Sequence, residues 1–417
     1  MNDMTIKEVK VNKLFGRFYH TIRFKKGGIS LIIGENGVGK TISLTMIESL
    51  FSKKFEYFFD IDFISMIVVF DDDIWSITKD KMKIKPNNLI APSLRIENSK
   101  GEVYQVPIAN FRRVSPRFRK AEDGMWYDRF DRIYYSPEAF VDKFGFAPFE
   151  YEQEGTPRWI EEKLQENKIK LIGAQRLYHI RPNDSVIVAI KRDSDELAKL
   201  IQREISKASE ISAALDSSFP NRLMSEMKRK KVHPFNELLK ALGDLENMRK
   251  RLNDVGLIGS ENKLHEWEIQ SDEMSKVLWL YIEDSKDKLN AYRVIMEKLT
   301  LMRNIINRRF KFKQLYIDKE KGYVFKDSPE SKTSIPVEKL SSGEQNEMVL
   351  IYHLLFNCNE NDIIMIDEPE ISLHISWQHH MIGDFDEISK LNNLSLLLAT
   401  HSPDLIGDNW NLVQTLS

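Results

Sequence analysis

The sequence predicts an α/β protein with a mixed or largely parallel sheet and a helical insert in the middle of the chain. Three observations predict it. An apolar run that ends at Ile33 is followed by a glycine-rich loop and then by a helical pattern. Strand-like and helical stretches alternate again from Leu340 onward. The part between them is rich in Leu, Met, Lys and Glu and poor in glycine, which is typical of helices.

The N-terminal part is expected to be rich in strands. Residues 5–33 alternate apolar and polar side chains, which predicts two strands joined near Lys26, Gly27 and Gly28. A helix is expected from Lys40 to about Lys53. Further strands are expected within 60–111, because the runs FISMIVVF, DIWSIT and SLRIEN are separated by aspartates and prolines.

The chain is expected to divide into an N-terminal lobe at 1–190, a helical insert at 191–310 and a C-terminal lobe at 311–417. Stretches such as DELAKLIQREISKASEISAAL have helical spacing. Prolines and glycines are expected to break the insert into short hairpins, at Pro220, Pro234, Gly243, Gly256 and Gly259. The C-terminal lobe is expected to contain, in order, a helix from Leu340, the strand DIIMIDE, a helix from about Ser372 and the strand LSLLLAT.

Composition narrows the class of protein. The 61 Lys and Arg residues balance 63 Asp and Glu, so the net charge of -2 does not draw the whole chain toward nucleic acid or a membrane. The single cysteine, Cys358, cannot form an internal disulfide, and no apolar run is long enough to cross a bilayer. We therefore expect a soluble cytoplasmic protein.

The strongest motif is a phosphate-binding loop. Gly34, Gly39, Lys40 and Thr41 fit the pattern G-x-x-x-x-G-K-[ST] between a predicted strand and a predicted helix. Backbone N–H groups of such a loop surround phosphate at a helix N-terminus, Lys40 reaches the outer phosphates and the Thr41 hydroxyl binds Mg²⁺. The alternative is a structural glycine turn. The residues expected to bind the nucleotide are Gly34, Glu35, Asn36, Gly37, Val38, Gly39, Lys40 and Thr41.

A second motif is DIIMIDEPE, in which an apolar strand ends in two acids. Asp367 is expected beside the metal, and Glu368 is expected to orient or deprotonate the attacking water. The alternative is an ordinary strand that ends in surface acids. The phosphate loop favours the first interpretation.

A third motif, LSSGEQNEMVLIYHLLF, places Ser341, Ser342 and Gly343 before an apolar helix. Free N–H groups at this helix N-terminus can bind an anion. The alternative is a simple N-cap with Glu344 in the first turn. The pattern resembles the LSGGQ signature of the ATP-binding-cassette superfamily, in the LSSGE form of its non-transporter branches.

Three weaker features complete the set. His401 follows the run LLLAT directly, where ATP-binding-cassette proteins have a switch histidine that contacts the γ-phosphate, although a lone histidine is more often structural. Gln175, after the strand-like KIKLIGA, is the candidate for the glutamine that couples the metal to the insert, and its alternative is a plain loop residue. The position of the family's D-loop is occupied by Ser372, Leu373 and His374.

Together these motifs resemble an ATP-binding-cassette ATPase of the SMC-like and OLD-like branch, and more narrowly the ATPase subunits of bacterial anti-phage systems of the PARIS or Septu type. Stretches that carry the narrower resemblance include LFGRFYHTIRF, LDSSFPNRLM and ATHSPDLIGDNWNL. The resemblance implies ATP and Mg²⁺ as ligands, with Glu368, His401 and Gln175 as catalytic residues and Thr41, Asp367 and Gln175 around the metal. It also implies a composite site, in which Ser341, Ser342 and Gly343 of one subunit contact the nucleotide of another.

Three functions are compatible with this resemblance. The first is a regulatory or scaffold ATPase that forms a homo-oligomer, senses a phage-derived trigger and controls a separate effector, which is expected to be a nuclease. The second is an ATPase that binds DNA ends, for which RRVSPRFRK at 112–120 and KRKK at 228–231 supply the basic residues. The third, a transporter subunit, is disfavoured by the large insert. The insert is short for SMC arms, and we expect no nuclease domain after His401.

Overall fold

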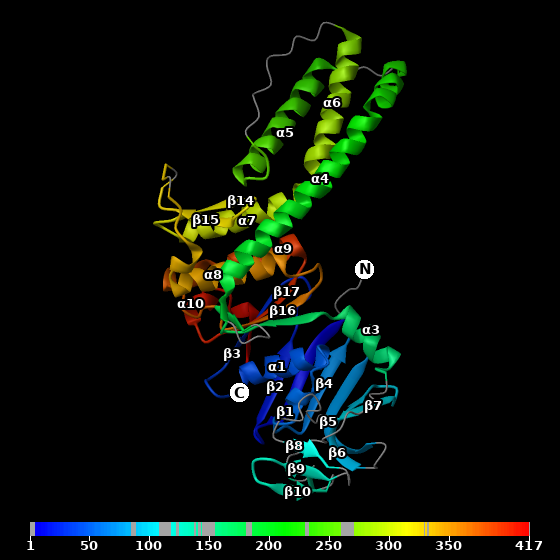
Figure 1. Ribbon diagram of the computed structural model, residues 1–417, viewed down its shortest axis with the longest axis vertical. Helices are drawn as coiled ribbons and strands as arrows, with labels where there is room; N and C mark the ends of the chain where they lie inside the picture. Colours follow the sequence, from blue (N-terminus) through cyan, green and yellow to red (C-terminus); the bar gives the residue numbers. More distant parts are fainter. Residues whose placement is uncertain are drawn as a thin grey trace. The chain divides into compact units, whose positions relative to one another are not determined.

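The computed structural model describes residues 5–84, 89–107, 118–121, 125–136, 139–140, 143, 155–180, 186–229, 233–259, 271–328, 330–331 and 333–416. The chain forms two compact units (Figure 1). The first contains Met1–Ala174 and Cys358–Ser417, and the second contains Gln175–Asn357. Each unit is described by itself below.

A five-stranded parallel sheet lies at the centre of the first unit. Its strand order is β11 (Ile169–Ile172), β16 (Ile363–Asp367), β17 (Ser395–Ala399), β3 (Ile29–Ile33) and β18 (Val413–Thr415). All four neighbouring pairs are parallel. β16 and β17 are buried along their whole length, which explains why they read as unbroken apolar runs. The predicted α/β class with a parallel sheet is confirmed.

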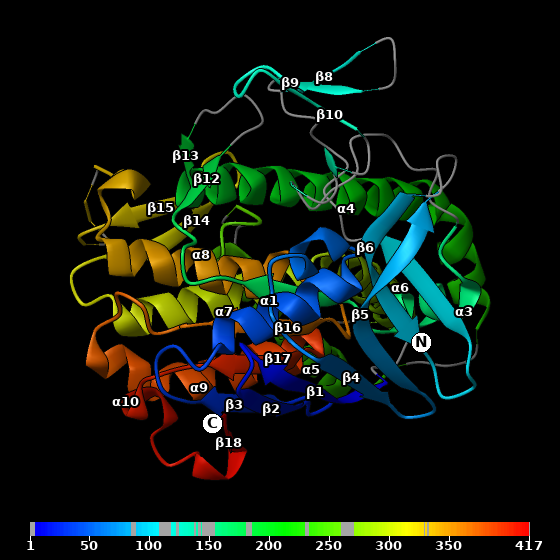
Figure 2. The same ribbon diagram turned by 90° about the horizontal axis from the view of Figure 1, so that it is seen from below.

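A six-stranded antiparallel sheet completes this unit. Its order is β2 (Phe18–Arg23), β1 (Ile6–Leu14), β4 (Ser65–Phe70), β5 (Ile74–Ile84), β6 (Leu89–Glu97) and β7 (Val103–Pro107). Helix α1 (Lys40–Phe51) contributes Leu44, Ile47 and Leu50 to one apolar cluster that also contains side chains of both sheets. In Figure 2, α1 lies over the region of β16 and β17. The helix that follows the phosphate loop is therefore anchored by the core.

The expectation of two strands within 5–33 is wrong, because three strands form there. β1 and β2 are joined by a tight turn at Phe15 and Gly16, both with positive φ. Phe15 is not a residue type that signals such a turn, so the alternating pattern continues across it in the sequence. The strands expected from FISMIVVF, DIWSIT and SLRIEN form as β4, β5 and β6.

The remaining elements of the first unit include one long helix, α9, and several short elements. They are η1 (Phe55–Phe58), β8 (Phe118–Lys120), β9 (Trp126–Asp128), β10 (Ile133–Tyr135), α3 (Arg158–Glu166), α9 (Ile375–Asn392), α10 (Pro403–Ile406) and η3 (Trp410–Leu412). Strands β8, β9 and β10 form a separate antiparallel sheet. Residues 112–117 of the basic stretch 112–120 lie outside the described residues.

The second unit is mainly helical. Its elements are β12 (Tyr178–Ile180), β13 (Val186–Val188), α4 (Ala189–Lys228), α5 (Phe235–Asp254), α6 (Asp272–Asn290), α7 (Arg293–Arg309), β14 (Gln314–Asp318), β15 (Gly322–Lys326), η2 (Val337–Lys339) and α8 (Ser342–Phe356). Helix α6 packs against both α4 and α5 (Figure 1). Helices α4 to α7 lie in the segment where a helical insert was expected, and the expected domain bounds of 191 and 310 stay a prediction. Helix α8, with the signature serines, belongs to the same compact unit as these helices.

Two of the expected helix breaks are wrong. Pro220 lies inside α4 and Gly243 lies inside α5. Proline removes one backbone hydrogen bond, yet α4 continues through Pro220, and ion pairs on both sides of it join α4 to α6. Arg222 pairs with Asp284, and Lys288 pairs with Asp216. Pro234 does precede α5, and Gly256 follows its end with a φ of 71°.

No helix in the described part of the chain is long and apolar enough to cross a membrane.

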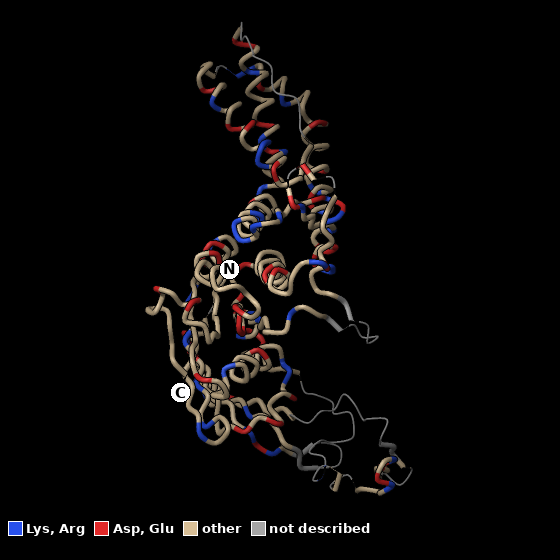
Figure 3. Tube along the Cα trace, turned by 90° about the vertical axis from the view of Figure 1, so that its left-hand side faces the viewer, with Lys and Arg blue, Asp and Glu red and all other residues tan. Residues whose placement is uncertain are grey.

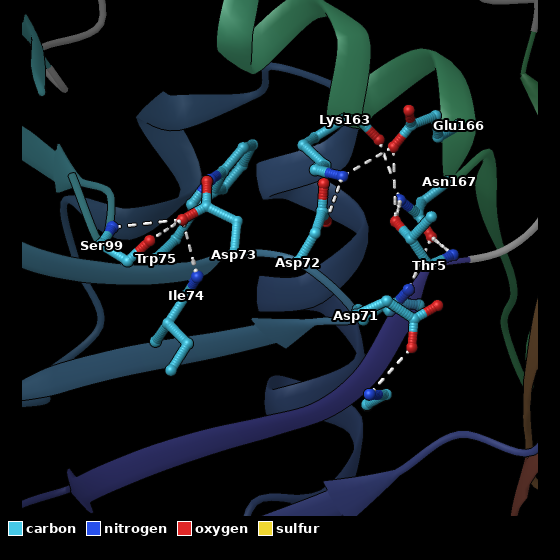
Figure 4. Close-up of polar contacts among 12 residues, drawn as sticks. Thr5, Asp71, Asp72, Asp73, Ile74, Trp75, Ser99, Lys163, Glu166 and Asn167 are labelled. Atoms are coloured by element: carbon cyan, nitrogen blue, oxygen red, sulfur yellow. Dashed lines mark hydrogen bonds and ion pairs between the residues drawn. The ribbon is translucent and has the colours of Figure 1, made fainter.

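The turn between β4 and β5 contains three consecutive aspartates, and each has a structural partner (Figure 4). Asp71 pairs with Lys7 at 2.9 Å and Asp72 pairs with Lys163 at 2.6 Å. Asp73 accepts hydrogen bonds from Ser99 and from the ring N–H of Trp75. The three consecutive aspartates therefore have a structural role, because they join the β4–β5 turn to α3 and to the β6–β7 connection.

Asn167, just after α3, fixes the start of β1 (Figure 4). Its Oδ1 accepts from the backbone N–H groups of Thr5 and Ile6, both at 2.9 Å. Its Nδ2 donates to the Thr5 hydroxyl and to the Lys163 carbonyl. Because Asn167 is only 1 % exposed, loss of its side chain leaves backbone donors unsatisfied in a buried place.

We therefore predict that Asn167→Ala lowers the free energy of unfolding of the first unit by about 2 kcal/mol. Hydrogen exchange at the amides of Thr5 and Ile6, together with thermal melting, measures the effect. Thr5→Val is the control, since it keeps the acceptor on Asn167 and is expected to cost less than about 1 kcal/mol. Equal effects of the two substitutions would contradict this role of Asn167.

Candidate functional site

The phosphate loop connects β3 to α1. Helix α1 begins at Lys40, and no side chain caps its N-terminus, so its first N–H groups are available to an anion. The Lys40 Nζ donates to the carbonyls of Gly34 and Glu35, at 2.8 and 3.1 Å. The ammonium thus lies across the mouth of the loop, which also contains Asn36, Gly37, Val38 and Gly39.

Glycine is required at two positions of this loop. Gly39 has a φ of 94°, and a Cβ there would lie 2.6 Å from the Leu14 side chain. A Cβ on Gly34 would lie 2.8 Å from the carbonyl oxygen of Leu416. A side chain at either position would therefore strain the loop or displace its neighbours.

Thr41 and Asp367 meet at the carboxyl end of the parallel sheet. The Thr41 hydroxyl donates to Asp367 Oδ2 at 2.8 Å. The other oxygen, Oδ1, is buried and has no hydrogen-bond partner among the described residues. A carboxylate with a spare oxygen beside a hydroxyl is the donor set that Mg²⁺ prefers, so these two residues fit the expected metal. Elsewhere in the described residues, no group of three or more His, Cys, Asp or Glu side chains could hold a metal ion.

Burial and charge oppose each other at Lys40 and Asp367. Burial lowers the pKa of Lys40, and the nearby carboxylates of Asp367, Glu368 and Glu370 raise it again in part. Burial raises the pKa of Asp367, and the Thr41 hydroxyl and the Lys40 ammonium act in the opposite direction. Keeping both groups charged in this buried place therefore costs free energy. A bound phosphate beside Lys40 and a bound cation beside Asp367 would reduce that cost.

Glu368 adopts a backbone conformation that is uncommon for its residue type. Its φ is 47°, and its N–H donates to the carbonyl of Ala399 on the neighbouring strand. A left-handed residue directly before a proline, here Pro369, is further disfavoured. The chain turns sharply at the end of β16 as a result, and Glu368 is half-buried directly beside Asp367 in the chain. Such strain is typical of functional sites.

His401 lies near the phosphate loop, as the switch-histidine hypothesis expects. Its Nδ1 is 3.4 Å from the Lys40 Nζ. Glu370 holds this segment, because its Oε1 accepts from the Thr400 hydroxyl at 2.6 Å and from the His401 N–H at 3.0 Å. Sequence reasoning missed Glu370. The only signal in the sequence was that Glu370 is the third acid of DEPE. Nothing in that spacing shows that its side chain reaches the segment after β17.

The signature residues form the N-terminus of α8 in the second unit. Ser341 is the N-cap, and Ser342 and Gly343 are the first two helical residues. Ser341 and Glu344 form a capping box, in which the Ser341 Oγ accepts from the Glu344 N–H and a Glu344 oxygen accepts from the Ser341 N–H. Ser341 is therefore an N-cap, as the alternative interpretation expects. Such a cap is compatible with a helix N-terminus that binds an anion.

The two remaining predicted features differ in how the structure places them. Ser372 has a φ of 62°, and His374 caps the N-terminus of α9 in the segment expected to be the D-loop. Gln175 is exposed, three residues beyond the end of β11, and it is the first residue of the second unit. Its role near the metal stays a prediction.

A hollow of about 600 Å³ lies against the phosphate loop. Gly34, Glu35 and Val38 line one side, and Thr400 and His401 line another. Phe18 and Trp410 add aromatic surface. A volume of this size is within the range of small-molecule sites, and its position beside Lys40 suits the remainder of a nucleotide whose phosphates bind the loop.

The phosphate loop, the acid at the end of β16 and the parallel sheet define a P-loop nucleoside-triphosphatase head. The family comparison agrees, since the model for the AAA ATPase domain matches residues 4–406. The chain belongs to this family and is an ATPase by family. No curated protein matches it.

Among solved structures, the chain is similar to Smc head domains. One is an Smc head domain with an extended coiled coil, bound to the C-terminal domain of ScpA and derived from Pyrococcus furiosus. It is 13 % identical to this chain, covers 97 % of this chain and 91 % of that chain, and has a TM-score of 0.36. Another is the SMC head domain from Thermotoga maritima, 12 % identical over 99 % of this chain and 95 % of that chain, with a TM-score of 0.34. The family assignment stands on the family match and not on these structures.

We predict that Asp367→Asn stabilises the nucleotide-free protein and abolishes ATP hydrolysis. A carboxyl whose pKa is raised on folding favours the folded state most below its ordinary pKa, and that contribution is lost as the pH rises through the raised value. At neutral pH the charge on Asp367 therefore opposes folding, and asparagine removes it.

Melting temperatures with and without Mg²⁺ and ATP test this. The Asp367→Asn variant is expected to melt higher without ligand and to lose the added stabilisation by Mg²⁺ and ATP. Asp408→Asn, at an exposed position, is the control and should change neither value. A lower melting temperature of the ligand-free Asp367→Asn protein would contradict the electrostatic cost assigned to Asp367.

Proposed function

We propose that this protein is an ATP-binding-cassette type ATPase in which ATP joins two copies of the chain. The observation that carries this is the convergence of Lys40, Thr41, Asp367 and His401 at one edge of the parallel sheet. The signature helix α8 belongs to the other compact unit and presents a capped N-terminus. In the proposed arrangement, the phosphate loop of one copy and Ser341, Ser342 and Gly343 of the second copy contact the same nucleotide.

The residues divide the chemistry among them. Lys40 and the loop N–H groups bind the β- and γ-phosphates, and Thr41 and Asp367 would hold Mg²⁺, which would supply positive charge to offset the phosphate oxygens. Glu368 orients the attacking water and accepts its proton. His401, placed by Glu370, contacts the γ-phosphate. Hydrolysis removes the link between the two copies and lets them separate.

We further propose that the cycle regulates a separate effector. The resemblance to ATPase subunits of anti-phage systems supports this assignment, and it suggests a nuclease as the effector and an invader-derived signal as the trigger. The helices α4, α5 and α6 are the part of the chain through which we expect a trigger to act. This proposal places the damaging chemistry in the partner and only the ATP-driven switch in this chain.

The described residues do not favour the alternative of a DNA-end binding ATPase. Along the helices of the second unit, Lys and Arg are interspersed with Asp and Glu (Figure 3). In the basic stretch 228–231, Arg229 pairs with Glu226 at 2.8 Å, and residues 230–231 lie outside the described part of the chain. A face of mixed charge is a poor match for the phosphate backbone.

Mixing two inactive variants tests the composite site. Lys40→Ala is expected to lose ATP binding, and Ser341→Arg is expected to bind ATP without hydrolysing it. A mixed pair contains one site with an intact Lys40 and an intact Ser341, so mixing is expected to restore activity toward about half the wild-type rate per mixed pair. Phosphate release measures the recovery, and mass photometry counts mixed pairs. Mixed pairs without recovered activity would refute the composite site.

The regulatory role predicts an effector that responds to nucleotide state. Glu368→Gln is expected to keep ATP bound and the copies joined, whereas Lys40→Ala is expected to leave them apart. Both variants, purified from a strain that carries the native locus, are compared for co-purified protein and for cleavage of DNA and RNA. We expect a partner that is retained differently by the two variants and that carries all nuclease activity. Cleavage by this chain alone that disappears with Lys40→Ala would overturn the assignment.

A further inference from the structure

A lysine directly before β14 is joined to the signature helix. The Lys313 Nζ donates to both carboxylate oxygens of Glu344, at 2.8 and 2.7 Å. The side chains of Lys313 and Glu344 are only 24 % and 13 % exposed. Both residues lie in the second unit, and their side chains are partly shielded from water, so this pair is less screened than a fully exposed surface ion pair.

Glu344 occupies a sensitive position. It is the third residue of α8, and its Oε2 also accepts from the Ser341 N–H at 2.7 Å. Gln345 holds the preceding segment, because its side-chain amide donates to the carbonyls of Leu340 and Glu338. The loop that leads into the signature is therefore held at two points, and one of them depends on a side-chain oxygen of Glu344.

A carboxylate at this point creates an electrostatic problem. The N-terminus of a helix attracts anions, and a negative side chain in its first turn reduces that attraction. The LSGGQ pattern has a neutral glutamine where this chain has Glu344. A triphosphate that approaches Ser341 and Gly343 would meet the negative charge of Glu344 unless a cation offsets it.

We infer that Lys313 is a positioning residue of the signature, which neutralises Glu344 and keeps its carboxylate on the Ser341 N–H so that the helix end can receive the nucleotide of a second copy. This inference rests on the proposed composite site. Lys313 itself touches neither nucleotide nor metal in this proposal. It acts only through Glu344.

Four variants distinguish the loss of the Lys313 charge from the loss of its packing. Lys313→Met is expected to lower kcat/KM about tenfold, the size of one uncompensated and partly screened charge. Glu344→Gln keeps the capping box and is expected to stay close to the wild type. The double variant is expected to recover most of the loss, because it has neither charge. Lys311→Met changes an exposed lysine two residues away and is the matched control.

Salt and mixing complete the test. The defect of Lys313→Met is expected to shrink as salt rises from about 0.05 to 0.5 M, because screening weakens repulsion, whereas a packing defect would persist. ATP binding by the Lys313→Met protein should match the wild type. Mixing it with the Lys40→Ala variant should create one fully intact site.

The outcomes distinguish the inference from the proposed function. If Ser341→Arg and Lys40→Ala restore each other but Lys313→Met behaves like the wild type, only the role of Lys313 is refuted. The same holds if the Lys313→Met defect is not relieved by Glu344→Gln. If Ser341→Arg and Lys40→Ala never restore each other, the composite site itself is refuted.

Discussion

The parallel register of β16, β17 and β3 is the constraint on which the site depends. Asp367 pairs with Ala399, and Ala399 pairs with Ile32 one residue before the end of β3. Because all three strands run in the same direction, the phosphate loop, Asp367 and the His401 segment lie together at the edge of the sheet where these strands end. A shift of one residue between β3 and β17 would turn each side chain to the opposite face. Side chains of α1 and of both sheets share one apolar core, and so packing away from the phosphate loop supports the proposed catalytic groups.

The central sheet and the phosphate loop could be predicted from sequence because their signals are local. β16 and β17 are buried on both faces and therefore read as unbroken apolar runs, and the loop needs glycine where a Cβ would collide with Leu14 or with the Leu416 carbonyl. The helical insert was predictable for a similar reason, since its apolar spacing persists over many turns. Pro220 shows the limit of such rules. Its helix continues across the proline, and Arg222 and Asp216 on either side contact residues of α6 that lie 62 and 72 positions away in the chain, contacts that no local pattern contains.

Glu370 and Lys313 were missed for the same physical reason. Each acts on a segment that lies 30 or 31 residues from it in sequence, through side-chain contacts that only the fold creates. Glu370 connects the turn after β16 to His401 after β17, and Lys313 connects β14 to the first turn of α8. A motif shows which residue types a reaction needs. The residues that hold a motif in place follow no fixed spacing, because they depend on which strands and helices become neighbours.

The two halves of the proposed site share an electrostatic principle. In the first unit, Lys40 and the acids around Asp367 are buried together, and each opposes the pKa shift that burial causes in the other. In the second unit, Glu344 is neutralised by Lys313 beside helix N–H groups that remain available to an anion. Neither half is complete as a site for a triphosphate: the first has the lysine and the metal-binding acid, and the second has a helix N-terminus. Because each half holds its charges in fixed positions before ligand arrives, little reorganisation would be needed when a nucleotide joins them. The proposed ATP-dependent association of two copies would then follow from the division of one phosphate-binding environment between two compact units.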